Sequence, residues 1–271
     1  MPVSELVRYF NLADEPGDST LYVEGERIAA WHEGLRLGSL FEPVVDLRRE
    51  RIVGHQARLV AWQDDGRLIT SEAAYAHSPS AESVVGFDRL VRTLHALNFL
   101  GQQRYAGGFL ILPVHARHLQ AVQSQHGLVF EAILKRCGLS PEDIVLELDH
   151  RDVSGCSHLV AALHNYRQRG YRLALSGVEG PLAAMQALQL RPDMVKLDAD
   201  AAQETISLLG QGAVRLLQDG IASRDDLAVA SAAAIELGKG SLFGLPDSEC
   251  RATHLSGRVA YNSLSSIGVV T

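Results

Sequence analysis

Short apolar runs alternate with longer amphipathic stretches along most of the 271-residue chain. The apolar runs predict strands at residues 41–47, 52–61, 108–114, 143–148, 172–175, 194–197, 213–217 and 241–243. The stretches between them predict helices at residues 83–100, 118–134, 158–169, 181–190 and 225–237. Strands that alternate with helices predict an α/β fold with a parallel sheet and right-handed crossovers. This alternation alone allows either a closed barrel or an open, doubly wound sheet.

The chain has room for one large domain and little else. Residues 1–18 end in a turn-rich stretch and predict a loosely attached arm. Residues 19–271 then form a single domain with a C-terminal tail, since a barrel of eight βα units takes about 250 residues. Between Lys196 and Asp219 the chain is short, and the helix there is expected to end near Leu209 because glycines follow it.

Composition and charge argue against several classes of binding partner. The formal net charge is −7, so no overall positive field attracts nucleic acid or an anionic membrane surface. No apolar run reaches the ~20 residues of a membrane helix, and the N-terminus lacks the pattern of a signal peptide. The three cysteines form no Cys-x-x-Cys pair, which argues against a zinc knuckle. We therefore expect a cytoplasmic protein with neither nucleic acid nor a membrane as partner.

One segment carries a recognisable motif. Pro192–Asp198 reads Pro-Asp-Met-Val-Lys-Leu-Asp and follows an apolar strand and a helical stretch. This order resembles the EAL family of cyclic di-GMP phosphodiesterases, in which Asp-Asp-Phe-Gly lies between that strand and that helix. Here Ser176 and Gly177 stand where the family has the two aspartates.

The resemblance extends in order from about Leu37 to Pro246. It includes Glu42–Val45, Gln56–Arg58, Glu147–His150, Asp219 with Ala222, and Lys239–Pro246. It implies an EAL-type (β/α)8 barrel, similar to a TIM barrel, whose first two strands run antiparallel.

The resemblance also has chemical consequences. In the family, acids and one asparagine at the strand ends hold two divalent cations that activate water, because hard cations need oxygen ligands. Here neutral side chains replace several of these groups, at Gln56, Ser176, Gly177 and Ala222, and Pro113 or His115 stands at the asparagine. We therefore expect no enzyme, no catalytic residue, no bound metal and no cofactor. The remaining polar residues predict a relic ligand site: Gln56, Arg58, Glu147, Lys196, Asp198, Asp219 and Lys239.

Three functions remain open. The favoured one is a catalytically inactive bacterial regulator that binds a protein partner, with an altered dimer and a contact face near Leu208 and Leu209. The alternative is a metal-independent receptor for cyclic di-GMP or another anion. For this receptor, Glu42 and Val60 predict weak or absent binding, because they replace a glutamine and an arginine that contact the nucleotide in the family. A remote alternative is an active phosphodiesterase, or a metalloenzyme that combines histidines with Glu147 or Asp219; those histidines are His55, His115, His118 and His150.

Overall fold

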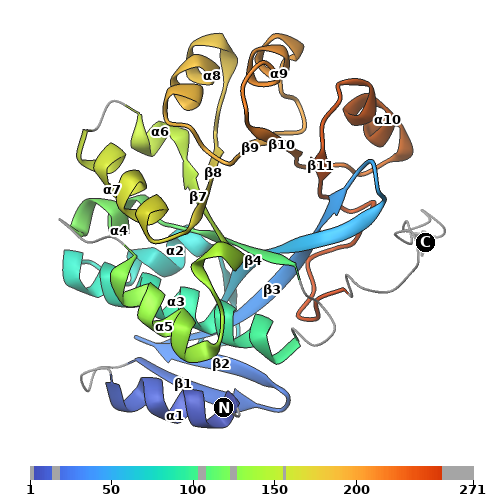
Figure 1. Ribbon diagram of the computed structural model, residues 1–271. Helices are drawn as coiled ribbons and strands as arrows, with labels where there is room; N and C mark the ends of the chain where they lie inside the picture. The colour runs from blue at the N-terminus through green and yellow to red at the C-terminus, as the bar shows by residue number, and fades with distance from the viewer. Residues whose placement is uncertain (1–2, 14–18, 103–107, 123–126, 155–156, 252–271) are drawn as a thin grey trace, which may run out of the picture.

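The structure is a computed structural model that describes residues 3–13, 19–102, 108–122, 127–154 and 157–251 (Figure 1). Within these ranges one sheet contains eleven strands, in the order β1-β2-β3-β11-β10-β9-β8-β7-β6-β4-β5. The strands are β1 Ser19–Glu24, β2 Arg27–His32, β3 Leu35–Asp46, β4 Arg51–Gln63, β5 Leu68–Ile69, β6 Phe109–Pro113, β7 Ile144–Asp149, β8 Arg172–Ser176, β9 Met194–Leu197, β10 Arg215–Gln218 and β11 Leu237–Gly238.

The sheet closes because β3 pairs with both β4 and β11. The pairs from β4 through β6, β7, β8, β9 and β10 to β11 are parallel, whereas β3 runs antiparallel to both of its barrel neighbours. The result is an eight-stranded mixed barrel in the described part of the chain. This confirms the predicted barrel with antiparallel first strands and rules out the open sheet.

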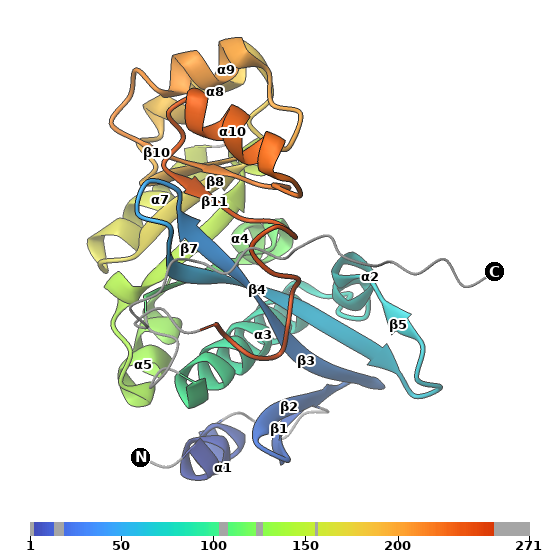
Figure 2. The same cartoon turned by 90° about the vertical axis from the view of Figure 1, so that its right-hand side faces the viewer.

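Helices surround the barrel (Figures 1 and 2). Those in the described ranges are α1 Val3–Ala13, α2 Ser71–Ala76, α3 Ala81–Gln102, α4 Ala116–Ala121, α5 Leu128–Cys137, α6 His150–Val153, α7 Ser157–Gln168, α8 Gly180–Gln189, α9 Gln203–Leu209 and α10 Arg224–Ala232, with a 3₁₀ turn at Pro141–Asp143. Among these helices, none is both long and apolar enough to cross a membrane.

Two apolar clusters hold the barrel together. A small cluster fills its interior, with side chains from β3 and from β6 to β11: Val44, Phe109, Ile111, Val145, Ala174, Met194, Leu217 and Leu237. A much larger cluster lies between the strands and the helices. A packed interior leaves the ends of the strands as the place for polar side chains.

The N-terminal segment differs from the predicted loose arm. Residues Val3–Ala13 form helix α1, and its Leu6, Val7 and Phe10 are buried in the large cluster. The side chain of Asn11 also pairs with the backbone of Leu21 on β1, through N–H···O contacts of 2.7 and 2.9 Å. Apolar residues at i, i+1 and i+4 thus attach the helix to the sheet that extends the barrel.

Two element boundaries also differ from the sequence prediction. The last barrel strand is β11 at Leu237–Gly238, and residues 241–243 form a turn. The chain turns at Gly240, where an added Cβ would lie 2.4 Å from the backbone oxygen of Ile221. The predicted helix at 118–134 is instead two helices, α4 and α5.

The short helix before Asp219 is confirmed. Helix α9 spans Gln203–Leu209 and is followed by Gly210. Leu209 is fully buried and Leu208 packs against the large cluster. The contact face predicted at these two leucines is therefore occupied by the chain's own core. The C-terminal tail, residues 252–271, lies outside the described residues.

Candidate ligand site at the barrel mouth

The predicted site residues lie at the carboxyl ends of the barrel strands, where barrels of this type place their functional groups. They are Gln56 and Arg58 on β4, Glu147 on β7, Lys196 on β9, Asp198 after β9, Asp219 after β10 and Lys239 after β11. Strand β3 adds Glu42, which is directly opposite Gln56 in the β3–β4 register.

Glu147 is the centre of the first group of contacts. Its Oε1 lies 2.5 Å from Nζ of Lys196, and its Oε2 accepts a 2.5 Å hydrogen bond from Nε2 of Gln56. Gln56 is buried, and its Oε1 has no hydrogen-bond partner among the described residues. The predicted ion pair between Glu147 and Lys196 is therefore present, with the glutamine as an additional donor.

The electrostatics of Lys196 follow from these neighbours. Burial alone would lower its pKa, because the charged ammonium loses water. That cost is the largest single effect, but the attraction and hydrogen bond of Glu147, together with smaller contributions from Asp219 and Asp198, outweigh it, and the pKa of Lys196 is raised. The ammonium is thus held in its charged form at the mouth.

Lys239 is the centre of the second group. Its side chain is fully buried, and its Nζ lies 2.9 Å from Oε2 of Glu42 and 2.8 Å from Oδ1 of Asp219. Glu42 also pairs with Arg58 at 3.1 Å, and Asp219 lies 3.9 Å from Lys196. A buried ammonium requires such carboxylate partners.

The two groups join into one network at the mouth. Three cations alternate with three carboxylates, and their formal charges cancel: Arg58, Glu42, Lys239, Asp219, Lys196 and Glu147. From the sequence, Glu42 was expected only to weaken nucleotide binding at the mouth through its negative charge. Its two cation partners were not predicted, because its pairing with Lys239 depends on barrel closure.

Asp198 is the predicted site residue that stands most apart. It is exposed, and its backbone oxygen accepts a 2.8 Å hydrogen bond from Nε2 of Gln218. Its carboxylate acts on the network at longer range, through the raised pKa of Lys196.

The loop after β8 has its own geometry. Gly177 has a φ of +65°, and a Cβ there would lie 2.6 Å from Oδ1 of Asp149. That carboxylate caps α6 by accepting from the backbone N–H of Arg151 and is paired with the guanidinium of the same residue at 2.6 Å. Any side chain at position 177 would therefore collide with this ion pair.

The divalent cations expected in the family would need several oxygen ligands that are not already engaged at the mouth. The converging carboxylates of Glu42, Glu147 and Asp219 each already contact an ammonium group, and Gln56 adds only an amide. In the described ranges, no group of three or more His, Cys, Asp or Glu side chains is arranged to hold a metal ion. This donor set as it lies does not fit a two-cation centre, and we derive no reaction step through one.

Three of the four histidines considered as metal ligands, His55, His115 and His118, lie in other contacts. His55 accepts from the backbone N–H of Arg251, and burial lowers its pKa to about 4. His115 stacks on Tyr75 and caps α4, while His118 lies beside Asp88. Their separate environments do not favour the metalloenzyme alternative.

Comparison with known proteins decides the family. The family model described as EAL domain matches residues 29–246, which is most of the chain. The chain belongs to the EAL family. Among curated proteins, none matches it.

Solved EAL structures share this fold. A Bacillus subtilis YkuI protein with an EAL domain, in complex with substrate cyclic di-GMP and calcium, is 17% identical over 78% of this chain and 56% of that one, with a TM-score of 0.64. A standalone EAL protein from Vibrio cholerae O395, bound to cyclic di-GMP, is 18% identical over 79% and 93%, with a TM-score of 0.65. The EAL enzyme Bd1971 is 16% identical over 78% of this chain, with a TM-score of 0.65, and the chain spans only 63% of its length.

These findings correct one expectation. We inferred from the replaced acids that the protein is not an enzyme. That inference was wrong, because the chain belongs to the EAL family and the proteins that share its fold are described as EAL enzymes or as complexes with substrate.

Proposed function

We propose that this EAL-domain protein acts in cyclic di-GMP signalling by binding the nucleotide at its barrel mouth, with the phosphates directed at the cations of the network. Nucleotide binding at the mouth is required whether or not the nucleotide is then cleaved.

The main support for this proposal is that the negative charge of Glu42 is compensated by two cations. The expectation of weak binding rested partly on its negative charge, which would repel a phosphate. Glu42 is instead paired with both Lys239 and Arg58, at 2.9 and 3.1 Å, so its charge is compensated. The charges of the six-residue network cancel, and Asp198 is the one predicted site residue that adds a further negative charge. Uncompensated acids throughout the mouth would require metal ions before an anion could approach.

Arg58 offers a substitute for the arginine that the resemblance places at Val60. Residues two apart on a strand point to the same face, so Gln56, Arg58 and Val60 share one side of β4. The Arg58 side chain is half exposed at the mouth. A guanidinium offers a phosphate two parallel donors, which makes this residue the first contact that we expect.

Equilibrium dialysis with labelled cyclic di-GMP tests the proposal, and chromatography of the same samples with magnesium or manganese reports cleavage. The proposal is supported if the protein retains labelled nucleotide and if Arg58→Gln retains less of it. Linear product that disappears in Glu147→Gln would assign cleavage to the same mouth. A protein that retains no nucleotide at millimolar concentration contradicts the proposal.

Regulation through a protein partner is a second candidate, and a different observation favours it. Leu182 and Met185 are three positions apart on α8 and are 70% and 55% exposed. Apolar neighbours on one helix face are typical of contact surfaces. Helix α1 lies at the far end of the molecule from this face, so the two do not form one surface (Figures 1 and 2). Light scattering of the pure protein, with Leu182→Glu as the variant, tests whether this face pairs two copies of the chain.

A further inference from the structure

The two lysines of the barrel mouth each lie between two carboxylates. Nζ of Lys239 is 2.9 Å from Oε2 of Glu42 and 2.8 Å from Oδ1 of Asp219. Nζ of Lys196 is 2.5 Å from Oε1 of Glu147 and 3.9 Å from Oδ2 of Asp219. Asp219 thus directs one oxygen at each ammonium group and lies between the two. Anionic oxygens arranged in this way around positive centres are also the ligands that hard divalent cations prefer.

Lys239 is the more enclosed of the two lysines. Its side chain is 0% exposed, whereas that of Lys196 is 15% exposed. Its backbone is fixed on both sides, because its N–H donates to the oxygen of Gln218 at 2.9 Å and its oxygen accepts from the N–H of Ile221 at 3.0 Å. A buried ammonium group is costly without anionic partners, so Lys239 and its two carboxylates depend on each other.

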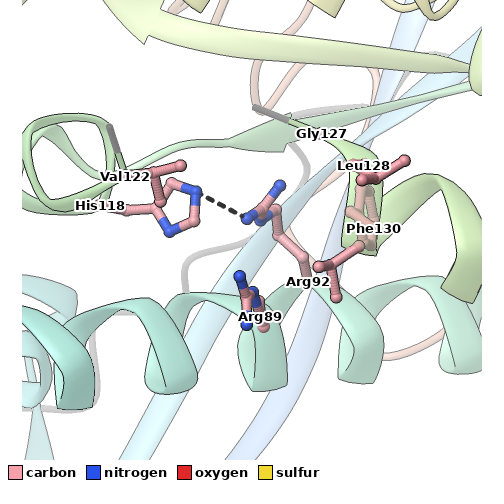
Figure 3. Close-up of a pocket in the computed structure, with 8 residues that line it drawn as sticks. Arg89, Arg92, His118, Val122, Gly127, Leu128 and Phe130 are labelled. Atoms are coloured by element: carbon pink, nitrogen blue, oxygen red, sulfur yellow. Dashed lines mark hydrogen bonds between the residues drawn. The ribbon is translucent and has the colours of Figure 1, made fainter. Parts of the chain in front are cut away.

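The other buried cation among the described residues, Arg92, has a different setting (Figure 3). Its Nη2 lies 2.6 Å from Oδ2 of Asp88 and 3.2 Å from Nε2 of His118. Its guanidinium is 4.7 Å from the centre of the Phe130 ring, and Arg92, His118 and Phe130 line a cavity of about 150 Å³ beside α3. Of the two buried cations, only Lys239 therefore lies between two carboxylates.

The position of the Lys239 Nζ atom suits a divalent cation as well. Mg²⁺ is typically held in proteins by one or two carboxylates and several waters, with oxygens at about 2.0 to 2.1 Å. Oε2 of Glu42 and Oδ1 of Asp219 would each move by less than about 1 Å to reach such distances from this point. A cation and the ammonium group cannot share the point, since both are positive. Binding of one therefore requires the other to leave.

We propose that Lys239 is a built-in counter-ion, which competes with divalent cations for Glu42 and Asp219 at the barrel mouth. Its ammonium group supplies the positive charge that the two carboxylates would otherwise take from a cation. Because it belongs to the chain, it competes at a high effective concentration. This competition is the physical reason why the mouth as it lies does not fit a two-cation centre. It is independent of the nucleotide binding proposed above.

Lys239→Met tests the competition, because it keeps the apolar stem of the side chain and removes its charge. Free Mn²⁺ gives an electron paramagnetic resonance signal that is lost on binding, so titration of the full chain without nucleotide measures the Kd. We expect the Kd for Mn²⁺ to fall by about tenfold or more in Lys239→Met, since two carboxylates lose their competitor. The matched control Lys135→Met changes the net charge equally at an exposed position on α5 and should leave the Kd unchanged.

A double variant locates the bound cation. Adding Glu42→Gln to Lys239→Met removes one of the two carboxylates and should abolish the gain in affinity. Equal Kd values in Lys239→Met and the unsubstituted protein would overturn the proposal, and so would a gain that persists in the double variant. If Lys239→Met is unfolded without Mn²⁺, circular dichroism during addition of Mn²⁺ gives the answer. Refolding supports the proposal, since a ligand that binds only the folded state stabilises it, and a chain that stays unfolded overturns it.

Discussion

The Nζ atom of Lys239 lies 2.9 Å from Oε2 of Glu42, although 197 positions separate the two residues in the chain. The contact exists because β11 pairs with β3 and closes the barrel. It places a buried cation beside a buried acid at the mouth, and the rest of the network extends from this pair to Glu147.

The pair of Lys196 and Glu147 gives a first prediction. Glu147 is buried, so Lys196→Met leaves an uncompensated charge and is expected to lower the free energy of unfolding by about 3 to 5 kcal/mol at pH 7. Urea denaturation measures the loss. The double variant with Glu147→Gln removes the charge together with its partner and should recover most of the stability. Equal losses in the single and double variants would mean that the pair does not stabilise the mouth.

Gly177 gives a second prediction with a built-in control. Gly177→Ala and Gly180→Ala both place a side chain at positive φ, +65° and +79°, but only the Cβ at position 177 meets a neighbour, Oδ1 of Asp149 at 2.6 Å. Left-handed strain is common to both and costs about 1 kcal/mol. We therefore expect Gly177→Ala to lower the Tm clearly more than Gly180→Ala. If the two variants melt together, the loop does not have the close contact described.

His95 gives a prediction for pH. It is buried on α3 beside Ser39, and burial lowers its pKa from 6.5 to about 3. Below pH 6.5 the imidazole of His95 is therefore protonated in the unfolded chain, whereas in the folded chain it stays neutral down to about pH 3. Stability is fully present above pH 6.5 and falls as the pH decreases through that window, by about 2 kcal/mol between pH 8 and pH 5 for this group.

Urea denaturation at pH 8 and pH 5 measures this loss. His95→Gln, which does not titrate, should show a loss smaller by about 2 kcal/mol than the unsubstituted protein. His164→Gln is the matched control, because His164 is exposed on α7. If His95→Gln loses as much free energy of unfolding between pH 8 and pH 5 as the unsubstituted protein, His95 is not neutral and buried as described.

The sequence predicted the barrel well because strand and helix periods are local signals. Strand β9 and helix α8 were placed within a residue of their observed bounds. The last strand was missed because its two residues pair only through barrel closure, and the apolar run at 241–243 packs as a turn instead. Helix α1 was missed because its apolar face is stabilised by β1 and not by its own propensity.

The sequence predicted most of the residues at the barrel mouth, but it predicted only one of the ion pairs between them. Glu147 with Lys196 was expected, because the family resemblance placed both at strand ends. The pairing of Glu42 with Lys239 was not, because it depends on two strands that meet only when the barrel closes. The inference that the protein is not an enzyme failed for a related reason: it was drawn from single replacements, whereas family membership is a property of the whole chain.

Calorimetric titration of cyclic di-GMP without divalent cations measures directly whether the barrel mouth binds the nucleotide through its cations. We expect saturable binding at micromolar concentration, with a Kd that rises about tenfold or more in Arg58→Gln and is unchanged in Arg48→Gln, a substitution in the exposed turn between β3 and β4. No heat of binding up to millimolar nucleotide, or equal affinity in Arg58→Gln and the unsubstituted protein, would contradict it.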